Sequence, residues 1–294
     1  MDIWETENFE QLNGYIPDIV ICLKFPTYYL RHSHKVVWLL HQHRAVYELW
    51  GINSPADHVP APEEVRLKED ITRRDTVHLA GCKKIYTISR RVSERLQIYN
   101  GLKSTPLYHP PAWLGRFYHA PAWPYIFCPS RLEGLKRQDL LIKAMKLATS
   151  PVKALIAGDG GDRPRLEQLI RELDVGDSVR LLGRISEAEM VTAYAHCLAT
   201  FFGPYDEDLG YVTLEAMLSA KPVITCHDSG GSLEFAVDGE TGRIVPPEPA
   251  AIAAAIDELY HNQKLARQMG ANGLEQYHRM NISWENVIDK LIAS

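Results

Sequence analysis

Two glutamates flank a loop that joins an apolar run to an amphipathic stretch. The apolar run, residues 198–202, leads into an acidic segment that contains Glu207, and the stretch after Gly210 carries Glu215. A strand–loop–helix junction of this kind can place helix N–H donors at a phosphate and carboxylates at sugar hydroxyls. Two glutamates at this interval also arise by chance, so their interpretation depends on the surrounding sequence.

Two cations follow another apolar segment, residues 125–128. Arg131 and Lys136 lie five positions apart, directly after that segment. Parallel open sheets bind ligands beyond the carboxyl ends of their strands, and these cations occupy such a position. They are candidates for binding an anion, and a solvated basic loop is the alternative.

A histidine takes the corresponding position earlier in the chain, where His41 follows the apolar residues 35–40. His41 could donate a hydrogen bond to a sugar hydroxyl, with His43 able to share that role, or it could be a structural histidine. His32, His34, His41 and His43 lie close together in the sequence, but no carboxylate or cysteine stands at the spacing that a metal site would need. We therefore expect no metal site.

The elements that must position these residues alternate between strands and helices, which predicts a parallel α/β architecture. Ser89 and Ser186 are predicted helix N-caps, the second with Glu189 completing a capping box. A proline-rich passage, residues 106–124, resists regular structure and is expected to connect two domains, residues 1–120 and 121–294, with the final helix able to pack back on the first domain. The predicted strands are residues 18–23, 35–40, 84–88, 125–128, 152–157, 179–182, 198–202, 222–225 and 243–245. The predicted helices include residues 62–80, 90–99, 138–148, 163–173, 250–261, 264–277 and 284–292.

The composition is typical of a globular protein with no bulk polyanionic partner. The chain has 294 residues, 46% of them hydrophobic and 23% charged, and a net charge of -5, so nucleic acid is not an expected partner. Residues 1–120 are mildly basic and rich in histidine, which suits either an anionic acceptor or ordinary solvated faces. The five cysteines form no C-x-x-C pair, and no apolar run reaches the length of a membrane span. We expect a cytoplasmic protein, with peripheral attachment to the inner face of the membrane as the alternative.

Two motifs resemble the family 4 retaining glycosyltransferases, which have the GT-B fold. Residues 207–216 read E-D-L-G-Y-V-T-L-E-A against the family's E-G-F-G-x-x-x-L-E-A, so both glutamates and the second glycine match, and Asp208 departs from the pattern. Residues 130–137 read S-R-L-E-G-L-K-R against G-R-L-x-x-x-K-G, so the two cations match, and Ser130 and Arg137 replace glycines.

The resemblance implies an α/β fold of the GT-B type, two Rossmann-like domains with parallel sheets facing a cleft, the first of them shortened. It implies that Arg131 and Lys136 hold the donor diphosphate, where fixed cations would stabilise the leaving group without a metal ion. It assigns the donor sugar to Glu207 and His41. It further implies that Glu215 binds the ribose and that the backbone amides of Gly210 and Tyr211 bind phosphate or sugar. The base is then expected to lie near Gly183 and Ile185.

The glycines elsewhere are less specific. Gly230 and Gly231, at the start of a predicted helix containing Glu234, resemble the family's glycine-rich approach to the cleft, and a packing turn is the alternative. The turn at residues 158–161 is not a true G-x-G-x-x-G, so it does not predict a nicotinamide site.

The expected function is therefore retaining transfer of a hexosyl group from a UDP- or GDP-type nucleotide-diphosphate sugar to a glycan or lipid-linked acceptor, as in polysaccharide biosynthesis. The front of the chain departs from the family, because only about 17 residues precede the first predicted strand. The first domain is then minimal, truncated, or completed by a partner chain or a second copy of the protein. The alternatives are a non-catalytic or partner-dependent nucleotide-sugar-binding homologue and another GT-B class, such as a glycan phosphorylase or an epimerase.

Overall fold

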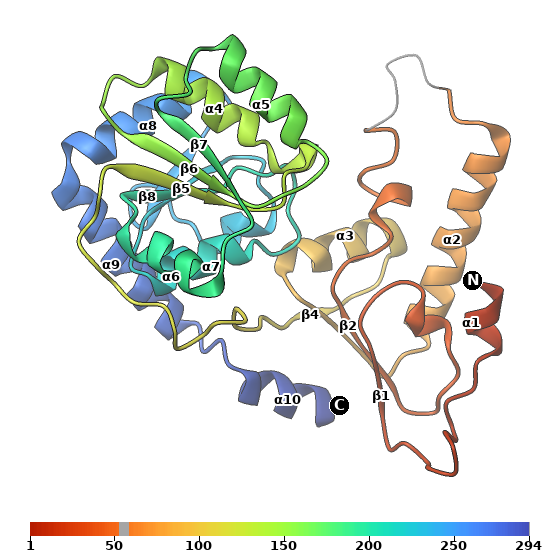
Figure 1. Cartoon of the computed structure of the whole chain (residues 1–294). Helices are drawn as coiled ribbons and strands as arrows, with labels where there is room; N and C mark the ends of the chain where they lie inside the picture. The colour runs from red at the N-terminus through yellow and green to blue at the C-terminus, as the bar shows by residue number, and fades with distance from the viewer. Residues whose placement is uncertain (53–58, 294) are drawn as a thin grey trace. The chain divides into compact units, whose positions relative to one another are not determined.

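The structure is a computed structural model that describes residues 1–52 and 59–293, and it contains two compact units (Figure 1). The first unit comprises Met1–His109 and Ser283–Ser294, and the second comprises Pro110–Ile282. Each unit contains one parallel sheet, of four strands in the first and six in the second. None of the helices in the described residues combines the length and apolar character that a bilayer crossing requires.

The sheet of the first unit has the strand order β1-β2-β3-β4. All five residues of β2 (Lys35–Leu39) are buried, which explains why the strand is apolar from Val36 onward. The helix α3 (Arg90–Asn100) begins as predicted, because the side chain of Ser89 accepts a hydrogen bond from the Val92 amide at 3.1 Å. The other elements of this unit are β1 (Val20–Cys22), β3 (Lys84–Thr87), β4 (Thr105–Pro106), α1 (Asp2–Thr6), α2 (Pro62–Ala80) and α10 (Trp284–Ile292).

The helix α10 is part of the first unit although it closes the chain. Trp284 makes an edge contact with Trp38 of β2, with ring centroids 6.2 Å apart, and the Tyr86 hydroxyl donates to the Lys290 carbonyl at 3.0 Å. The last described residues therefore complete the core around the first sheet.

The sheet of the second unit has the order β10-β9-β8-β5-β6-β7, and all its pairings are parallel. Its strands are β5 (Tyr125–Pro129), β6 (Lys153–Ala157), β7 (Val179–Gly183), β8 (Ala199–Phe201), β9 (Val223–Cys226) and β10 (Gly242–Val245). The first strand, β5, is central and the chain moves outward from it in both directions, which is the doubly wound arrangement.

Helices cover both faces of this sheet (Figure 1). Ile126 and Cys128 of β5 pack in one apolar cluster, and Tyr125 and Phe127 pack in another, as the alternation of side chains along a strand requires. The helices are α4 (Gln138–Leu147), α5 (Arg163–Glu172), α6 (Glu187–His196), α7 (Tyr211–Leu218), α8 (Pro249–His261) and α9 (Gln263–Arg279). Ser186 and Glu189 form the predicted capping box at the start of α6.

Two local expectations were wrong. The proline-rich passage is not irregular from its start, because Thr105–Pro106 pairs with β3 as the edge strand β4. An edge strand needs no donor on its outer side, so a proline is tolerated there. The segment Gly231–Glu234 forms a short 3₁₀ helix where an α-helix was expected. The backbones of Gly230 and Gly231 are pressed against the loop at residues 206–209, which fixes the path of the chain there.

Candidate functional site

The second sheet has its topological switch point between β5 and β8. From β5 the chain runs to β6 and β7 on one side, and from β8 to β9 and β10 on the other. In open α/β sheets, ligands bind at such a point, beyond the carboxyl ends of the strands. These two loops carry the cation pair and the first glutamate identified from sequence.

Lys136 and Glu207 meet at this point. The Lys136 ammonium donates to a Glu207 carboxylate oxygen, and both side chains are mostly buried, at 16% and 17% exposed. The Lys136 ammonium also lies 5.7 Å from the centre of the Phe202 ring. A partly desolvated ion pair beside an aromatic face offers both a cation for an anion and an acceptor for hydroxyl groups.

The backbone around Glu207 is fixed by the loop after β9. The Glu207 carbonyl accepts a hydrogen bond from the Gly231 amide at 2.7 Å, and its amide donates to the Ser229 carbonyl at 3.3 Å. A Cβ atom on Gly230 would lie 2.5 Å from the Glu207 carbonyl oxygen, and one on Gly231 would lie 2.4 Å from that of Asp208. The two glycines are therefore needed for the close approach that holds the glutamate loop in place.

Arg137, which replaces a glycine of the family pattern, ties the same loops together. Its guanidinium donates to both carboxylate oxygens of Asp228, at 2.6 and 2.8 Å, and to the carbonyls of Gly203 and Pro204, at 2.8 and 2.9 Å. Its φ of 50° lies in the left-handed region, which explains why glycine suits the position. Sequence reasoning treated Arg137 only as a departure; a charged residue in a glycine position was the available signal.

Arg131 is placed differently from Lys136. Its side chain is 73% exposed and pairs with Glu133 at 2.9 Å, whereas Lys136 pairs with Glu207. The Arg131 backbone is fixed, because its carbonyl accepts a hydrogen bond from Gln138 at 2.8 Å. The exposed ion pair with Glu133 is weak enough to be exchanged for an anion.

Glu215 lies in α7 and is bound by a tyrosine that sequence reasoning missed. The Tyr194 hydroxyl of α6 donates to the Glu215 carboxylate at 2.6 Å. Burial raises the pKa of Glu215, and the hydrogen bond from Tyr194 opposes that rise. Tyr194 uses one carboxylate oxygen, and among the described contacts the other oxygen accepts none, so it can take one further donor.

The backbone positions assigned to the donor include two glycines with positive φ, Gly183 at 71° and Gly210 at 86°. Gly183 ends β7, and Gly210 is the N-cap of α7, where Tyr211 is the first helical residue. A Cβ on Gly210 would lie 2.3 Å from the Ser232 hydroxyl oxygen, so only glycine fits. Ile185 is half-buried and packs with the apolar cluster around Tyr194.

The turn at residues 158–161 is a close approach of two loops. Gly158 has a φ of 133°, and a Cβ there would lie 1.9 Å from the Ser130 carbonyl oxygen. A Cβ on Gly160 would lie 2.3 Å from the Leu132 carbonyl oxygen. These two glycines allow the β6 loop to support the loop that carries Arg131 and Lys136.

His41 lies in the first unit, just beyond β2. Its Nδ1 is 2.6 Å from the Gln42 carbonyl oxygen, so a proton on Nδ1 donates to that carbonyl. The loop is anchored because the buried Gln42 side chain donates to Asn100, which in turn donates to the Thr76 hydroxyl at 2.8 Å. His43 stacks on Phe25, with ring centroids 5.0 Å apart.

The family model for glycosyl transferases group 1 matches residues 120–276, more than half of the chain. This chain belongs to that family. The match covers nearly all of the second unit and includes every site residue described above that lies in it. His41 and the residues around it belong to the first unit and lie outside the match.

Similar sequences include other glycosyltransferases. The chain is 29% identical over 171 residues to a D-inositol 3-phosphate glycosyltransferase of Corynebacterium diphtheriae, covering 55% of this chain and 39% of that protein. It is 32% identical over 108 residues to the mouse (Mus musculus) alpha-1,3/1,6-mannosyltransferase ALG2, covering 37% and 26%. The chain thus spans about two fifths or less of the length of these relatives.

Solved structures share the fold of this group 1 member. Anabaena HepE, solved in complex with UDP and glucose, superposes with a TM-score of 0.72 at 18% identity, over 89% of this chain and 72% of that one. The sucrose-phosphate synthase of Thermosynechococcus elongatus gives 0.77 at 20% identity, over 94% and 74%. The α/β architecture with two parallel sheets of the GT-B type, expected from the sequence, is confirmed.

Proposed function

We propose that this chain transfers a hexosyl group from a nucleotide-diphosphate sugar to a glycan or lipid-linked acceptor, with retention at the anomeric carbon as in family 4. The observation that carries the proposal is the contact between Lys136 and Glu207 at the switch point of the second sheet. Group 1 membership and the relatives' names support transfer of a sugar, and Anabaena HepE, a structural neighbour, is solved with UDP and glucose.

In the proposed donor complex the diphosphate takes Lys136 from Glu207 and Arg131 from Glu133. Each cation then stabilises the negative charge that grows on the departing phosphate, so these side chains supply the stabilisation that a metal ion would otherwise give. Glu207, released from Lys136, accepts from the sugar hydroxyls. Glu215 accepts from a ribose hydroxyl through its free oxygen, with Tyr194 holding the carboxylate in place.

The backbone supplies the remaining proposed contacts. Gly210 and Tyr211 offer N–H groups at the start of α7, where the helix dipole favours an anion. The base would lie against Gly183 and Ile185, and His41 would contact the sugar from the first unit. The acceptor hydroxyl forms the new bond to the anomeric carbon as the bond to phosphate breaks, and its proton passes to the leaving phosphate oxygen.

The test is a calorimetric titration with UDP-glucose and GDP-mannose, followed by measurement of released nucleoside diphosphate. We expect one donor to bind and turn over with acceptor present, and Lys136→Met to weaken its binding at least tenfold, since a charge-assisted contact contributes about 1.5–3 kcal/mol. Glu207→Gln should lower turnover more than binding, because its proposed partner is the reacting sugar.

The matched control is Lys146→Met, which removes an exposed lysine from the last turn of α4 and should leave both measurements unchanged. Binding without turnover for every acceptor would support the nucleotide-sugar-binding alternative. Equal donor use by the native protein and by Lys136→Met and Glu207→Gln would refute the site.

A further inference from the structure

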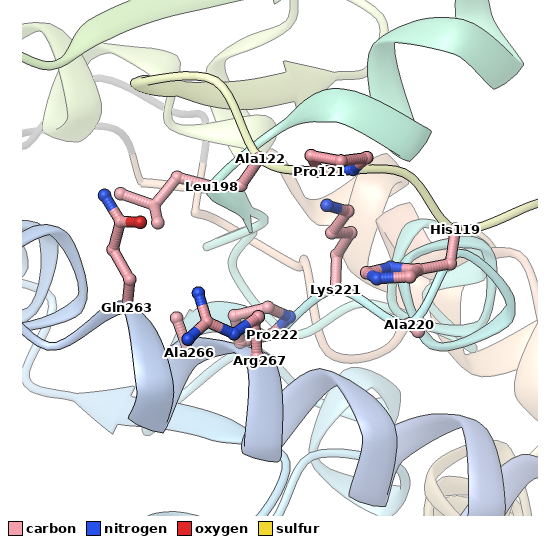
Figure 2. Close-up of a pocket in the computed structure, with 10 residues that line it drawn as sticks. All are labelled: His119, Pro121, Ala122, Leu198, Ala220, Lys221, Pro222, Gln263, Ala266 and Arg267. Carbon is pink, nitrogen blue, oxygen red and sulfur yellow. The ribbon is translucent and has the colours of Figure 1, made fainter.

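A cavity lies in the second unit, at the end of the sheet opposite the proposed donor site. It encloses about 250 Å³ and lies where β8 and β9 begin, whereas Lys136 and Glu207 lie beyond the carboxyl ends of the strands. Figure 2 shows it between the segment preceding β5 and the first turns of α9. Of the residues that line it in the described structure, none is acidic.

Lys221 supplies a buried positive charge to this cavity. Its side chain is only 3% exposed, and its ammonium donates to the Ala120 carbonyl at 2.9 Å. The ammonium has three protons, and among the described contacts only this one takes a proton from it. Burial lowers the pKa of Lys221, and no carboxylate offsets this effect. A desolvated charge without a counter-ion is unfavourable, so an anion in the cavity would relieve it.

The other walls of the cavity also carry basic side chains. His119 lies beside Lys221, and burial together with that ammonium lowers the pKa of His119. Arg267 extends from α9 on the opposite wall (Figure 2). The first turn of α9 holds no acidic residue, and its Leu265 amide is capped by the neutral Asn262 side chain, so the helix start brings no negative charge to the cavity. Three basic side chains and a helix start therefore surround one small space.

The shape of the turn directs Lys221 inward. Ala220, the residue before it, has a φ of 49°, and its carbonyl is pressed against α9 at Gly270, where a Cβ would lie 2.0 Å away. The Lys221 amide also donates to the Ala216 carbonyl at 2.9 Å. The ammonium is thus held at the cavity by a rigid turn and cannot easily move out to solvent.

We propose that this cavity binds the phosphate group of a small phosphate monoester, held by Lys221, Arg267 and His119. Phosphate suits the site because it accepts several charge-assisted hydrogen bonds and is favoured at a helix start. The cavity is smaller than most sites for drug-sized ligands, and its Pro121, Leu198 and Pro222 walls suit a compact organic body beside the phosphate. The site is independent of the donor site.

The experiment is calorimetric titration of the whole chain with inorganic phosphate and with glycerol 3-phosphate, at constant ionic strength. We expect saturable binding of both, tighter for the ester, and at least tenfold weaker binding by Lys221→Met. Methionine has similar length and no charge to bury, so this variant should remain folded. Arg267→Gln, at an exposed position on α9, should weaken binding as well and gives a second measurement if Lys221→Met does not fold.

Two further variants test whether phosphate binds in this cavity and not elsewhere on the chain. Lys146→Met should bind phosphate like the native chain, because that lysine does not line the cavity. In a Lys136→Met chain, which lacks the donor-site lysine, adding Lys221→Met should still weaken phosphate binding at least tenfold. Vesicles containing phosphatidic acid, whose headgroup is a phosphate monoester, distinguish the source of the phosphate. Binding to the vesicles alone would assign a lipid headgroup, and binding of glycerol 3-phosphate would assign a soluble ester. No saturable binding by either, or native affinity in both Lys221→Met and Arg267→Gln, would overturn the proposal.

Discussion

Arg137 offers the sharpest test of how the site loops are held. Replacing it with alanine removes a bidentate bond to Asp228 and leaves the carbonyls of Gly203 and Pro204 without that donor. Gly203 and Pro204 are buried, whereas Asp228 is 36% exposed, so the ion pair itself is screened and the carbonyl bonds dominate. We expect Arg137→Ala to lower the free energy of unfolding by about 2–3 kcal/mol.

The variant Arg137→Gly separates the contribution of the Arg137 hydrogen bonds to stability from the contribution of its backbone strain. A left-handed conformation costs a non-glycine residue about 1–2 kcal/mol. Glycine avoids that cost but adds about 0.5–1 kcal/mol of chain entropy to the unfolded state. The glycine variant should therefore be about 0.5–1 kcal/mol more stable than the alanine variant, and still less stable than the native chain.

The assay is hydrogen exchange measured by mass spectrometry over increasing urea, which reports the opening free energy of peptides from β5 and β8 separately from the first unit. Arg180→Ala, at an exposed position in β7, is the control and should change nothing. If Arg137→Gly were as stable as the native chain, the bonds to the loops would contribute no more than the strain that glycine removes. That result would refute the assigned role.

Three more predictions concern the same unit. Gly158→Ala should destabilise the unit by more than about 3 kcal/mol, because the new Cβ would meet backbone atoms at a residue with positive φ. Gly161→Ala is the matched control and should be nearly neutral, since no atom lies within 4 Å of its Cβ position. Urea denaturation measures the free energy of unfolding of both variants. For Asp257, burial would raise the pKa, but hydrogen bonds from Ser150 and its neighbour Thr149 outweigh it and lower the pKa to about 2. The stabilisation by the Asp257 carboxylate is present above its ordinary pKa and is lost as the pH falls through about 2. We therefore expect Asp257→Asn to lower the free energy of unfolding by about 1–2 kcal/mol near neutrality. Unfolding curves measured in acid should show no difference between this variant and the native chain. For Glu215, whose folded pKa is raised by burial, the stabilisation is complete below the unfolded pKa and is lost as the pH rises through the folded one. The stability of the native chain relative to Glu215→Gln should therefore decrease as the pH rises above the ordinary glutamate value of 4.5, and an unchanged difference in thermal melts would contradict the assignment.

The local elements could be predicted because their causes are local. The helix α6 begins where Ser186 and Glu189 satisfy each other's backbone amides, and those contacts involve residues three positions apart. The strand β2 is buried on both faces, so its apolar run appears directly in the sequence. The exception, Pro106, pairs at a sheet edge, and nothing local distinguishes an edge strand from a linker.

The sequence by itself determined the alternating strands and helices and the candidate residues Arg131, Lys136, Glu207 and Glu215. Arg131 pairs locally with Glu133, but only the tertiary structure decided the partners of Lys136, Glu207 and Glu215, because those partners come from distant parts of the chain. Lys136 meets Glu207 across 71 positions, and Arg137 reaches Asp228 across 91. Such contacts depend on the strand order, which places the loops after β5, β8 and β9 at one edge of the sheet, and no spacing along the chain specifies that order.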